Sequence, residues 1–198
     1  MDLLGKTIGQ YQLTELIHEA DNVVYKGFQD SMNRYVAVKI LAPGQAANQT
    51  FVQQFQRDMQ AISQLQHPNI LPLYDHGYKD RFLYMATQYV EGGTLRDRMP
   101  HYFSPERTEH MVKAIAGGLD YLHSPGITHG NLKPTNILVD APGHPLLADF
   151  GLVKMQGAAE NITDTGEIMG TPGYIPPEQA TGKKATPHRS RSPGRNTG

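Results

Sequence analysis

The hydrophobic period of this sequence changes once, at Glu91-Gly92-Gly93, and that change limits the folds that the chain can adopt. Before it, β-branched and aromatic stretches alternate with polar residues, which predicts strands at 11–17, 23–28, 35–41, 70–74 and 82–89. One helix is predicted among them at 51–66, ended by Pro68. After the glycines, a helix is expected at 105–123, with Ser104 as its cap and Pro105 at its first position. The sequence therefore predicts an α+β fold with a strand-rich first half.

Composition excludes several classes of protein. The 198 residues carry a formal net charge of −1, which provides no overall attraction to nucleic acid or to an anionic membrane. Because there is no cysteine, disulfides and thiol catalysis are excluded and a reducing compartment is favoured. No run of about 18 apolar residues occurs, and the first residues do not resemble a signal peptide. We expect a soluble, cytoplasmic protein with no membrane segment and no nucleic-acid partner.

The last residues of the chain, 179–198, differ in composition from the rest. They hold five of its 18 lysines and arginines, no acidic residue and almost nothing apolar. Such a segment cannot bury enough apolar surface to become ordered, so we predict a basic disordered tail at 183–198. A basic tail can also contact nucleic acid or acidic partners, but a solvated end is the simpler interpretation.

Two short apolar stretches, 137–139 and 146–148, flank a turn-forming sequence at 141–144. If they pair as a hairpin centred between Pro142 and Gly143, Asn136 and Asp149 lie opposite each other at its open end. An amide oxygen and a carboxylate side by side suit Mg²⁺, which takes a few protein oxygens and completes its shell with phosphate and water.

Lys39 lies in the middle of an apolar stretch, where alternation places it on the opposite face from Val36, Val38 and Ile40. A lysine in such a position can extend its ammonium group into solvent. Alternatively, it pairs with Asp58, which lies near the apolar face of the following helix, and the pair then presents an ammonium group to a phosphate.

Several motifs occur together in an order that a known family shares. They are Val36-Ala37-Val38-Lys39, His67-Pro68-Asn69-Ile70, residues 129–136, Asp149-Phe150-Gly151, Gly170-Thr171-Pro172 and Pro176-Pro177-Glu178. On these motifs, the chain resembles the eukaryotic-like (Hanks-type) serine/threonine protein kinases, especially their bacterial branch, over residues 9–182. The resemblance implies a bilobal fold, with a β-rich N-lobe at 9–90 that has one helix and an incomplete helical C-lobe at 91–182.

The resemblance also implies a site for ATP and Mg²⁺. Lys39 would hold the α- and β-phosphates with Asp58 as its partner, and Lys133 would approach the γ-phosphate. Asn136 and Asp149 would bind Mg²⁺. The adenine site, with its gatekeeper and hinge, would be formed by Ile17, Val24, Ala37, Thr87, Gln88, Val90 and Leu138.

Further positions follow the family's pattern beyond Gly151. Thr171 would lie beside the catalytic loop, as in kinases that phosphorylate serine or threonine. Thr163 and Thr165 match activation-segment positions that are often phosphorylated. A protein substrate or a protein partner is therefore implied.

The chain departs from the family at the catalytic loop. Asn131 stands where the family has the aspartate that accepts the proton of the substrate hydroxyl. An amide cannot act as a base near neutral pH, and losing a positioned base typically lowers the rate by about 10²–10⁴. Gly130 replaces the arginine that receives an activation-segment phosphate, so control by phosphorylation is not expected in the usual form.

The phosphate loop and the C-terminal region also depart from the pattern. The turn at 18–22 has no glycine and carries Glu19 and Asp21, which would obstruct and repel a triphosphate. After about Pro187 the amino-acid sequence no longer resembles the family. A premature end of the gene would leave such a change. We predict a pseudokinase with weak or absent phosphotransfer and residual ATP/Mg²⁺ binding. The alternatives are an active Ser/Thr kinase and a truncated gene product without function.

Overall fold

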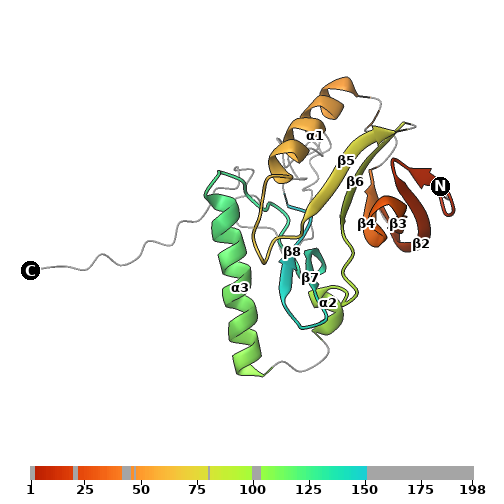
Figure 1. Cartoon of the computed structure of the whole chain (residues 1–198). Helices are drawn as coiled ribbons and strands as arrows, with labels where there is room; N and C mark the ends of the chain where they lie inside the picture. The colour runs from red at the N-terminus through yellow and green to blue at the C-terminus, as the bar shows by residue number, and fades with distance from the viewer. Residues whose placement is uncertain are drawn as a thin grey trace, which may run out of the picture.

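An antiparallel sheet of six strands forms the first half of the molecule (Figure 1). The computed structural model describes residues 3–19, 22–41, 46, 48–79, 81–99 and 104–150. The strands, in sheet order β1-β2-β3-β4-β6-β5, are β1 (Thr7–Ile8), β2 (Tyr11–Glu19), β3 (Val23–Gln29), β4 (Arg34–Ile40), β6 (Phe82–Gln88) and β5 (Leu73–Lys79). The short 3-10 helix η1 (Asp30–Met32) leads from β3 into β4. The predicted strand-rich first half is confirmed, and β1 is an addition to it.

One face of the sheet is closed by side chains of its own strands and of the N-terminal segment. Along β4, Val36, Val38 and Ile40 are at most 4% exposed, whereas Ala37 and Lys39 lie on the opposite face. This period-2 pattern is the one that the sequence predicted. The strand order places β4 between β3 and β6, inside the sheet. The buried cluster consists of Leu3, Ile8, Tyr11, Leu13, Tyr25, Val36, Val38, Ile40, Phe82, Tyr84 and Ala86.

Helix α1 (Gln49–Ile62) packs against the other side of the strands. The side chain of Asn48 caps it by accepting a hydrogen bond from the backbone N–H of Phe51. The prediction of a helix at 51–66 is right in type, but the predicted end is too late. Helix α1 ends at Ile62 because the N–H groups of Gln64 and Leu65 donate to carbonyls only three residues back, as in a 3-10 turn and not in an α-helix.

The described part of the second half contains two helices and a hairpin (Figure 1). These are α2 (Leu95–Arg98), α3 (Pro105–His123), the 3-10 turn η3 (Pro134–Asn136), β7 (Ile137–Val139) and β8 (Pro145–Leu147). Strand β8 packs against α3, and α2 packs against β7 and η3. Ser104 caps α3 and Pro105 takes its first position, as predicted. None of the described helices is long and apolar enough to cross a membrane.

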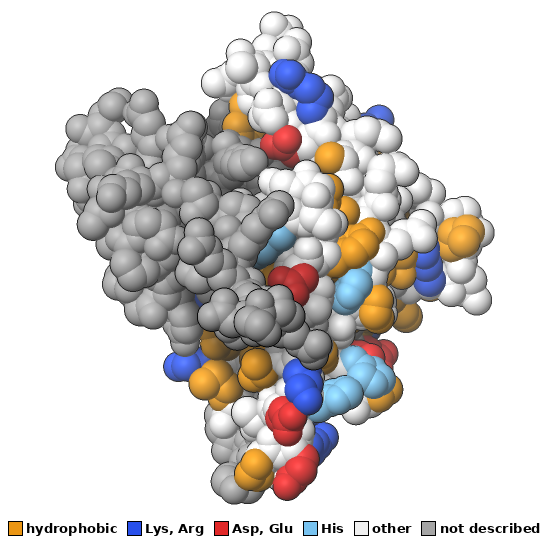
Figure 2. All heavy atoms as spheres, turned by 90° about the vertical axis from the view of Figure 1, so that its left-hand side faces the viewer, with side chains coloured by type: hydrophobic (Ala, Val, Ile, Leu, Met, Phe, Trp, Pro, Cys, Tyr) orange, Lys and Arg blue, Asp and Glu red, His pale blue; other side chains and the backbone are white. Residues whose placement is uncertain are grey.

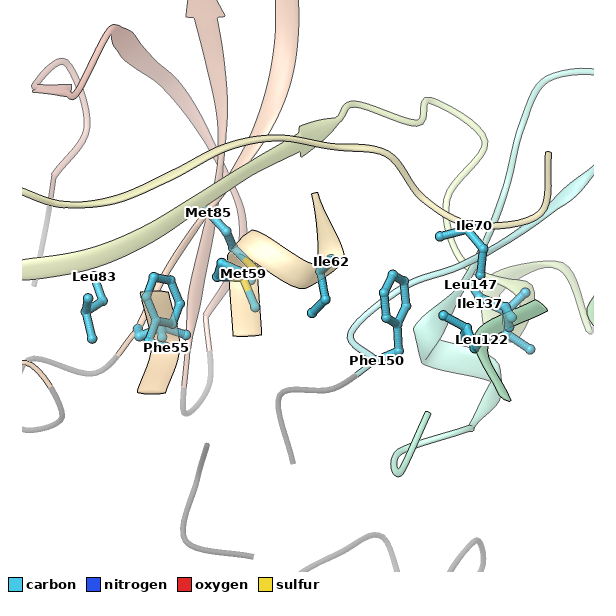
Figure 3. Packing of buried hydrophobic residues seen from close by; sticks show 11 residues of the cluster. Phe55, Met59, Ile62, Ile70, Leu83, Met85, Leu122, Ile137, Leu147 and Phe150 are labelled. Atoms are coloured by element: carbon cyan, nitrogen blue, oxygen red, sulfur yellow. The ribbon is translucent and has the colours of Figure 1, made fainter. Parts of the chain in front are cut away.

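A second hydrophobic core joins the two halves. Figure 3 shows Phe150 with Ile62 of α1 on one side and Leu122 and Ile137 on the other. The buried members of this core are Leu41, Phe55, Met59, Ile62, Ile70, Leu83, Met85, Leu122, Ile137, Leu147 and Phe150. Because α1, β6, α3 and the hairpin all contribute, the position of α1 depends on the second half of the chain.

The segment between α1 and β5 also belongs to both halves. Ile70 forms a parallel bridge with Leu147 of β8, and the Leu147 N–H donates to the Asn69 carbonyl at 2.9 Å. The Leu71 N–H donates to the Leu147 carbonyl, also at 2.9 Å. The predicted strand at 70–74 is therefore wrong in its position, since the strand of the main sheet, β5, begins only at Leu73. Pro72, which has no N–H to donate, separates this pairing from β5 of the main sheet.

Candidate functional site

Lys39 occupies the middle of β4, on the face of the sheet that looks toward the second half. It pairs across the sheet with Val24 of β3 and Met85 of β6. Its Nζ lies 2.8 Å from Oδ1 of Asp149, and its side chain is only 15% exposed. The interpretation that Lys39 extends into solvent is therefore wrong, because a carboxylate holds its ammonium group inside the site.

Asp58 does not pair with Lys39, contrary to the prediction. Its Oδ1 accepts a hydrogen bond at 2.8 Å from Nε2 of Gln54, one helical turn earlier, and its Oδ2 is buried without a hydrogen-bond partner. Aspartate is one methylene shorter than glutamate, so its carboxylate stays close to α1, where the Gln54 amide reaches it. The charge that holds Lys39 thus comes from Asp149, in the second half of the molecule.

Asp149 follows β8 in a left-handed backbone conformation, with φ 58°. Such a conformation costs on the order of 1–3 kcal/mol for a residue with a Cβ, and aspartate is among the residues that adopt it most readily. The next residue, Phe150, is 5% exposed, and its ring meets that of His129 edge-on with centroids 6.1 Å apart. The turn at Asp149 therefore sends one side chain toward Lys39 and the next into the core.

The hairpin brings Asn136 and Asp149 to the same end, but its register differs by one residue from the prediction. Ile137 pairs with Leu147, so the residue opposite Asn136 is Ala148, whose N–H donates to the Asn136 carbonyl at 2.9 Å. The second strand is Pro145–Leu147, one residue earlier than predicted. The reason lies in the turn, where Oδ1 of Asp140 accepts from the N–H groups of both Gly143 and His144.

The oxygens at this end of the hairpin suit Mg²⁺. Asn136 is 6% exposed and donates its Nδ2 to the Asn131 carbonyl at 2.8 Å, which leaves its Oδ1 as an acceptor. Asp149 offers the carboxylate oxygen that does not contact Lys39. Within the described ranges, no three His, Cys, Asp or Glu residues are grouped to hold a metal. Magnesium at Asn136 and Asp149 would therefore need phosphate and water oxygens as its other ligands.

The loop before η3 is anchored by a buried histidine. Burial lowers the pKa of His129 from 6.5 to about 4, against the weaker opposing effects of a backbone hydrogen bond and the Asp149 charge. The imidazole is therefore neutral at pH 7, and its Nδ1 accepts a hydrogen bond from the Asn131 N–H at 3.3 Å. Gly130, between them, has φ 75°, a conformation that glycine adopts without strain. The backbone around Asn131 is thus fixed from two sides, by His129 and by Asn136.

The residues predicted to surround an adenine lie on two surfaces. Val24 shares a cross-strand row with Lys39 and Met85, and the next row on the same face is Lys26, Ala37 and Thr87. On the other surface, Val90 at the end of the first half and Leu138 of β7 pack against a small buried cluster, Leu71, Leu146 and Ala148.

Gln88, predicted to belong to the hinge, is anchored through its backbone, since its N–H donates to the Pro72 carbonyl at 3.2 Å. Ile17 is 45% exposed, at a shift of register between β2 and β3. That these residues bind adenine stays a prediction. Sequence reasoning missed Met85, although alternation from Thr87 along β6 would have placed it beside Lys39.

The predicted turn at 18–22 is shorter in the structure. Glu19 pairs with Val23, so His18 and Glu19 belong to β2. Lys133, predicted to approach the γ-phosphate, is half-buried and directly precedes η3. The remaining predicted positions lie outside the described residues: Ala20 and Asp21 of the turn, Thr163, Thr165, Thr171, residues 176–178 and the tail at 183–198.

Figure 2 shows acidic, basic and histidine side chains interspersed with hydrophobic ones on the side of the molecule that it displays. The described residues on that face form no surface of a single charge sign.

Comparison with known proteins identifies curated relatives. PrkC, a serine/threonine-protein kinase of Bacillus subtilis (strain 168), is 35% identical over 188 residues, which cover 93% of this chain and 29% of PrkC. PknL, a serine/threonine-protein kinase of Mycobacterium tuberculosis (strain ATCC 25618 / H37Rv), is 34% identical over 168 residues, which cover 84% of this chain and 42% of PknL. The chain therefore spans less than half the length of these relatives.

Solved structures agree with this relationship. The kinase domain of Mycobacterium tuberculosis PknI has a TM-score of 0.71 at 29% identity, covering 93% of this chain and 70% of that one. The apo form of PpkA-294 has a TM-score of 0.74 at 21% identity, which shows likeness of fold alone. The protein kinase domain family matches residues 20–190. The chain belongs to the protein kinase family, among the serine/threonine kinases of the Hanks type found in bacteria.

Proposed function

We propose that this chain is a protein kinase-fold module that binds Mg²⁺·ATP weakly and transfers its γ-phosphate weakly or not at all. The observation that carries the proposal is Asn131, an amide where the family has an aspartate base. Its backbone is held by His129 and Asn136, so the residue occupies an ordered loop. An amide can hydrogen-bond a hydroxyl group but cannot take its proton near neutral pH, so a loss of about 10²–10⁴ in rate is expected.

The groups that would hold the nucleotide are present and close together. Lys39 and Asp149 neutralise each other at 2.8 Å, which keeps both charged groups stable in a partly buried site. With nucleotide bound, the Lys39 ammonium group would hold the α- and β-phosphates, and Asp149 with Oδ1 of Asn136 would hold Mg²⁺. When bound, Mg²⁺ would neutralise part of the negative charge of the phosphates.

The turn between β2 and β3 argues for weak binding. Residues 18–22 contain no glycine, so Cβ atoms would limit the approach of backbone N–H groups to phosphates. Glu19, at the end of β2, adds a carboxylate beside the turn, and Asp21 adds another in sequence. Like-charge repulsion would lower the affinity for a triphosphate.

The proposal is tested by thermal unfolding of the full 198-residue chain with and without ATP and Mg²⁺. We expect a cooperative transition that rises with Mg²⁺·ATP in the wild type and in Lys79→Met, a control at an exposed lysine of β5. The rise should disappear in Lys39→Met. A cooperative transition whose temperature does not change with ATP and Mg²⁺ would overturn the binding part of the proposal. The absence of any transition would instead favour a gene product without independent function.

An active kinase is the second candidate, because Lys39, Asn136 and Asp149 all occupy positions suited to their family roles. It predicts transfer of labelled γ-phosphate to a generic basic protein, abolished by Lys39→Met. Transfer by the wild type at or slightly above the level of that variant would support the pseudokinase, whereas transfer about 10²-fold or more above it would support the active kinase.

A further inference from the structure

Three aromatic side chains gather at the edge of the predicted adenine wall. Phe28 of β3 pairs with Tyr35 of β4, and their rings lie 5.1 Å apart. Tyr89 follows Gln88 in the predicted hinge, and counting on from the Val36–Gln88 pair places it across from Tyr35. This row therefore borders the row of Lys26, Ala37 and Thr87.

Lys26 connects this row to the hinge. Its Nζ lies 4.4 Å from the ring centroid of Tyr35 and 4.5 Å from that of Tyr89. Both distances are within the range of a favourable cation–π interaction. Among the residues that the structure describes, Lys26 forms no salt bridge, and the contacts of its ammonium group are those with the rings of Tyr35 and Tyr89.

We propose that Lys26 is a positioning residue that holds Tyr89 against the sheet and thereby fixes the hinge, Gln88 to Val90, beside Ala37 and Thr87. The proposal rests on the proposed function insofar as the hinge contacts a nucleotide. The backbone holds the start of the predicted hinge, since Gln88 pairs with Val36 of β4 and its N–H donates to the Pro72 carbonyl. Lys26 adds a side-chain constraint on the next residue, Tyr89, from β3, two strands away from the strand that continues into the hinge.

A cation is needed for this contact, and shape alone is not sufficient. Methionine has a similar flexible and apolar stem but no charge, so it can cover the rings without the electrostatic attraction. Arginine keeps the charge and stacks well on aromatic rings. Lys26→Met and Lys26→Arg therefore separate the cation from the packing of the stem.

Hydrogen exchange of the segment 86–92, measured in the full chain, tests the proposal. Lys26→Met should raise its exchange rate about three- to tenfold, since each cation–π contact accounts for roughly a two- to fivefold effect. Lys26→Arg should stay within about twofold of the wild type, and Lys79→Met should not change the rate. Tyr89→Leu should raise the rate as Lys26→Met does, and the two together should add little. Unchanged exchange in Lys26→Met, or failure of arginine to restore it, would overturn the proposal.

Affinity for Mg²⁺·ATP gives the second readout. We expect Lys26→Met to weaken it by a similar factor, with the exchange of β7 and β8 unchanged as an internal control. Faster hinge exchange with unaltered affinity would overturn the link to the nucleotide. If the wild type binds no nucleotide, the proposed function fails, while the exchange data still decide whether Lys26 holds the hinge.

Discussion

The two sides of the candidate site, Lys39 on the sheet and the loop around Asn131, differ in which of the family's residues they keep. On the sheet side, Lys39 lies in an uninterrupted antiparallel register and finds a charged partner in Asp149. On the loop side, the supports of the backbone are in place, but Asn131 replaces the reactive group. The comparison teaches that the hydrogen bonds which hold this loop, to His129 and from Asn136, are made by the backbone of residue 131. A different side chain at this position is therefore compatible with the same two hydrogen bonds.

The largest expected effect comes from returning a carboxylate to the loop. At saturating nucleotide, Asn131→Asp should raise phosphotransfer by about 10² or more, because a base then faces the substrate hydroxyl. Affinity for Mg²⁺·ATP should change less than about twofold, since the Asn131 side chain is not among the groups proposed to bind nucleotide. Transfer rates and binding isotherms of the same preparation check both. If transfer stays at background while the nucleotide is bound, the defect extends to the sheet side.

The pH dependence of stability tests whether His129 supports the loop. The unfolded chain takes up a proton on this histidine near pH 6.5, whereas the folded protein does so only near pH 4, so stability should fall as pH decreases from 6.5 to 4. The loss from this group should reach at most about 3 kcal/mol, and urea unfolding across this range measures it.

The matched variants for this pH dependence are His129→Phe and His144→Gln. His129→Phe should flatten the slope, leaving a residual part from His76, whose pKa burial also lowers. His144→Gln, in the exposed hairpin turn, should leave most of the slope in place. An equal slope in the wild type and His129→Phe would show that the loop is supported by other contacts.

On the sheet side, Lys39→Met and Asp149→Asn should each weaken Mg²⁺·ATP binding by about tenfold or more, because a charge-assisted hydrogen bond contributes roughly 1.5–3 kcal/mol. Lys39→Met removes a phosphate contact, so its effect should persist in the absence of Mg²⁺. The effect of Asp149→Asn should depend on Mg²⁺. Titrations with ATP at varied Mg²⁺ separate the two, and identical Mg²⁺ profiles would contradict the assigned roles.

Asp58 should show the smallest effects. Because Lys39 pairs with Asp149, Asp58→Asn should leave nucleotide affinity unchanged. Asp58→Glu lengthens the side chain and should let it compete for Lys39, which frees Asp149 and raises affinity by roughly two- to fivefold. A loss of affinity in Asp58→Asn would mean that Asp58 binds Lys39 in the nucleotide complex.

Sequence reasoning was accurate where side-chain alternation decides the structure. It predicted that Lys39 lies on the face of β4 opposite Val36, Val38 and Ile40, and it predicted the helix cap at Ser104. It failed where single contacts between distant segments decide. The partner of Lys39 depended on one methylene at Asp58 and on a hydrogen bond from Gln54. The register of the hairpin depended on two hydrogen bonds to Asp140, which no periodicity encodes.

The bridge between residues 69–71 and β8 has a consequence for dividing the molecule. A fragment ending at Glu91 would uncover Ile70 and Leu71, which are 3% and 7% exposed in the intact protein. The complementary fragment would carry β8 with an open edge, and such edges recruit other strands. Neither piece should be stable alone, yet the two expressed together should reassemble through this edge. At Glu91-Gly92-Gly93 the hydrophobic pattern of the sequence changes, but the two halves on either side should unfold together as one cooperative unit.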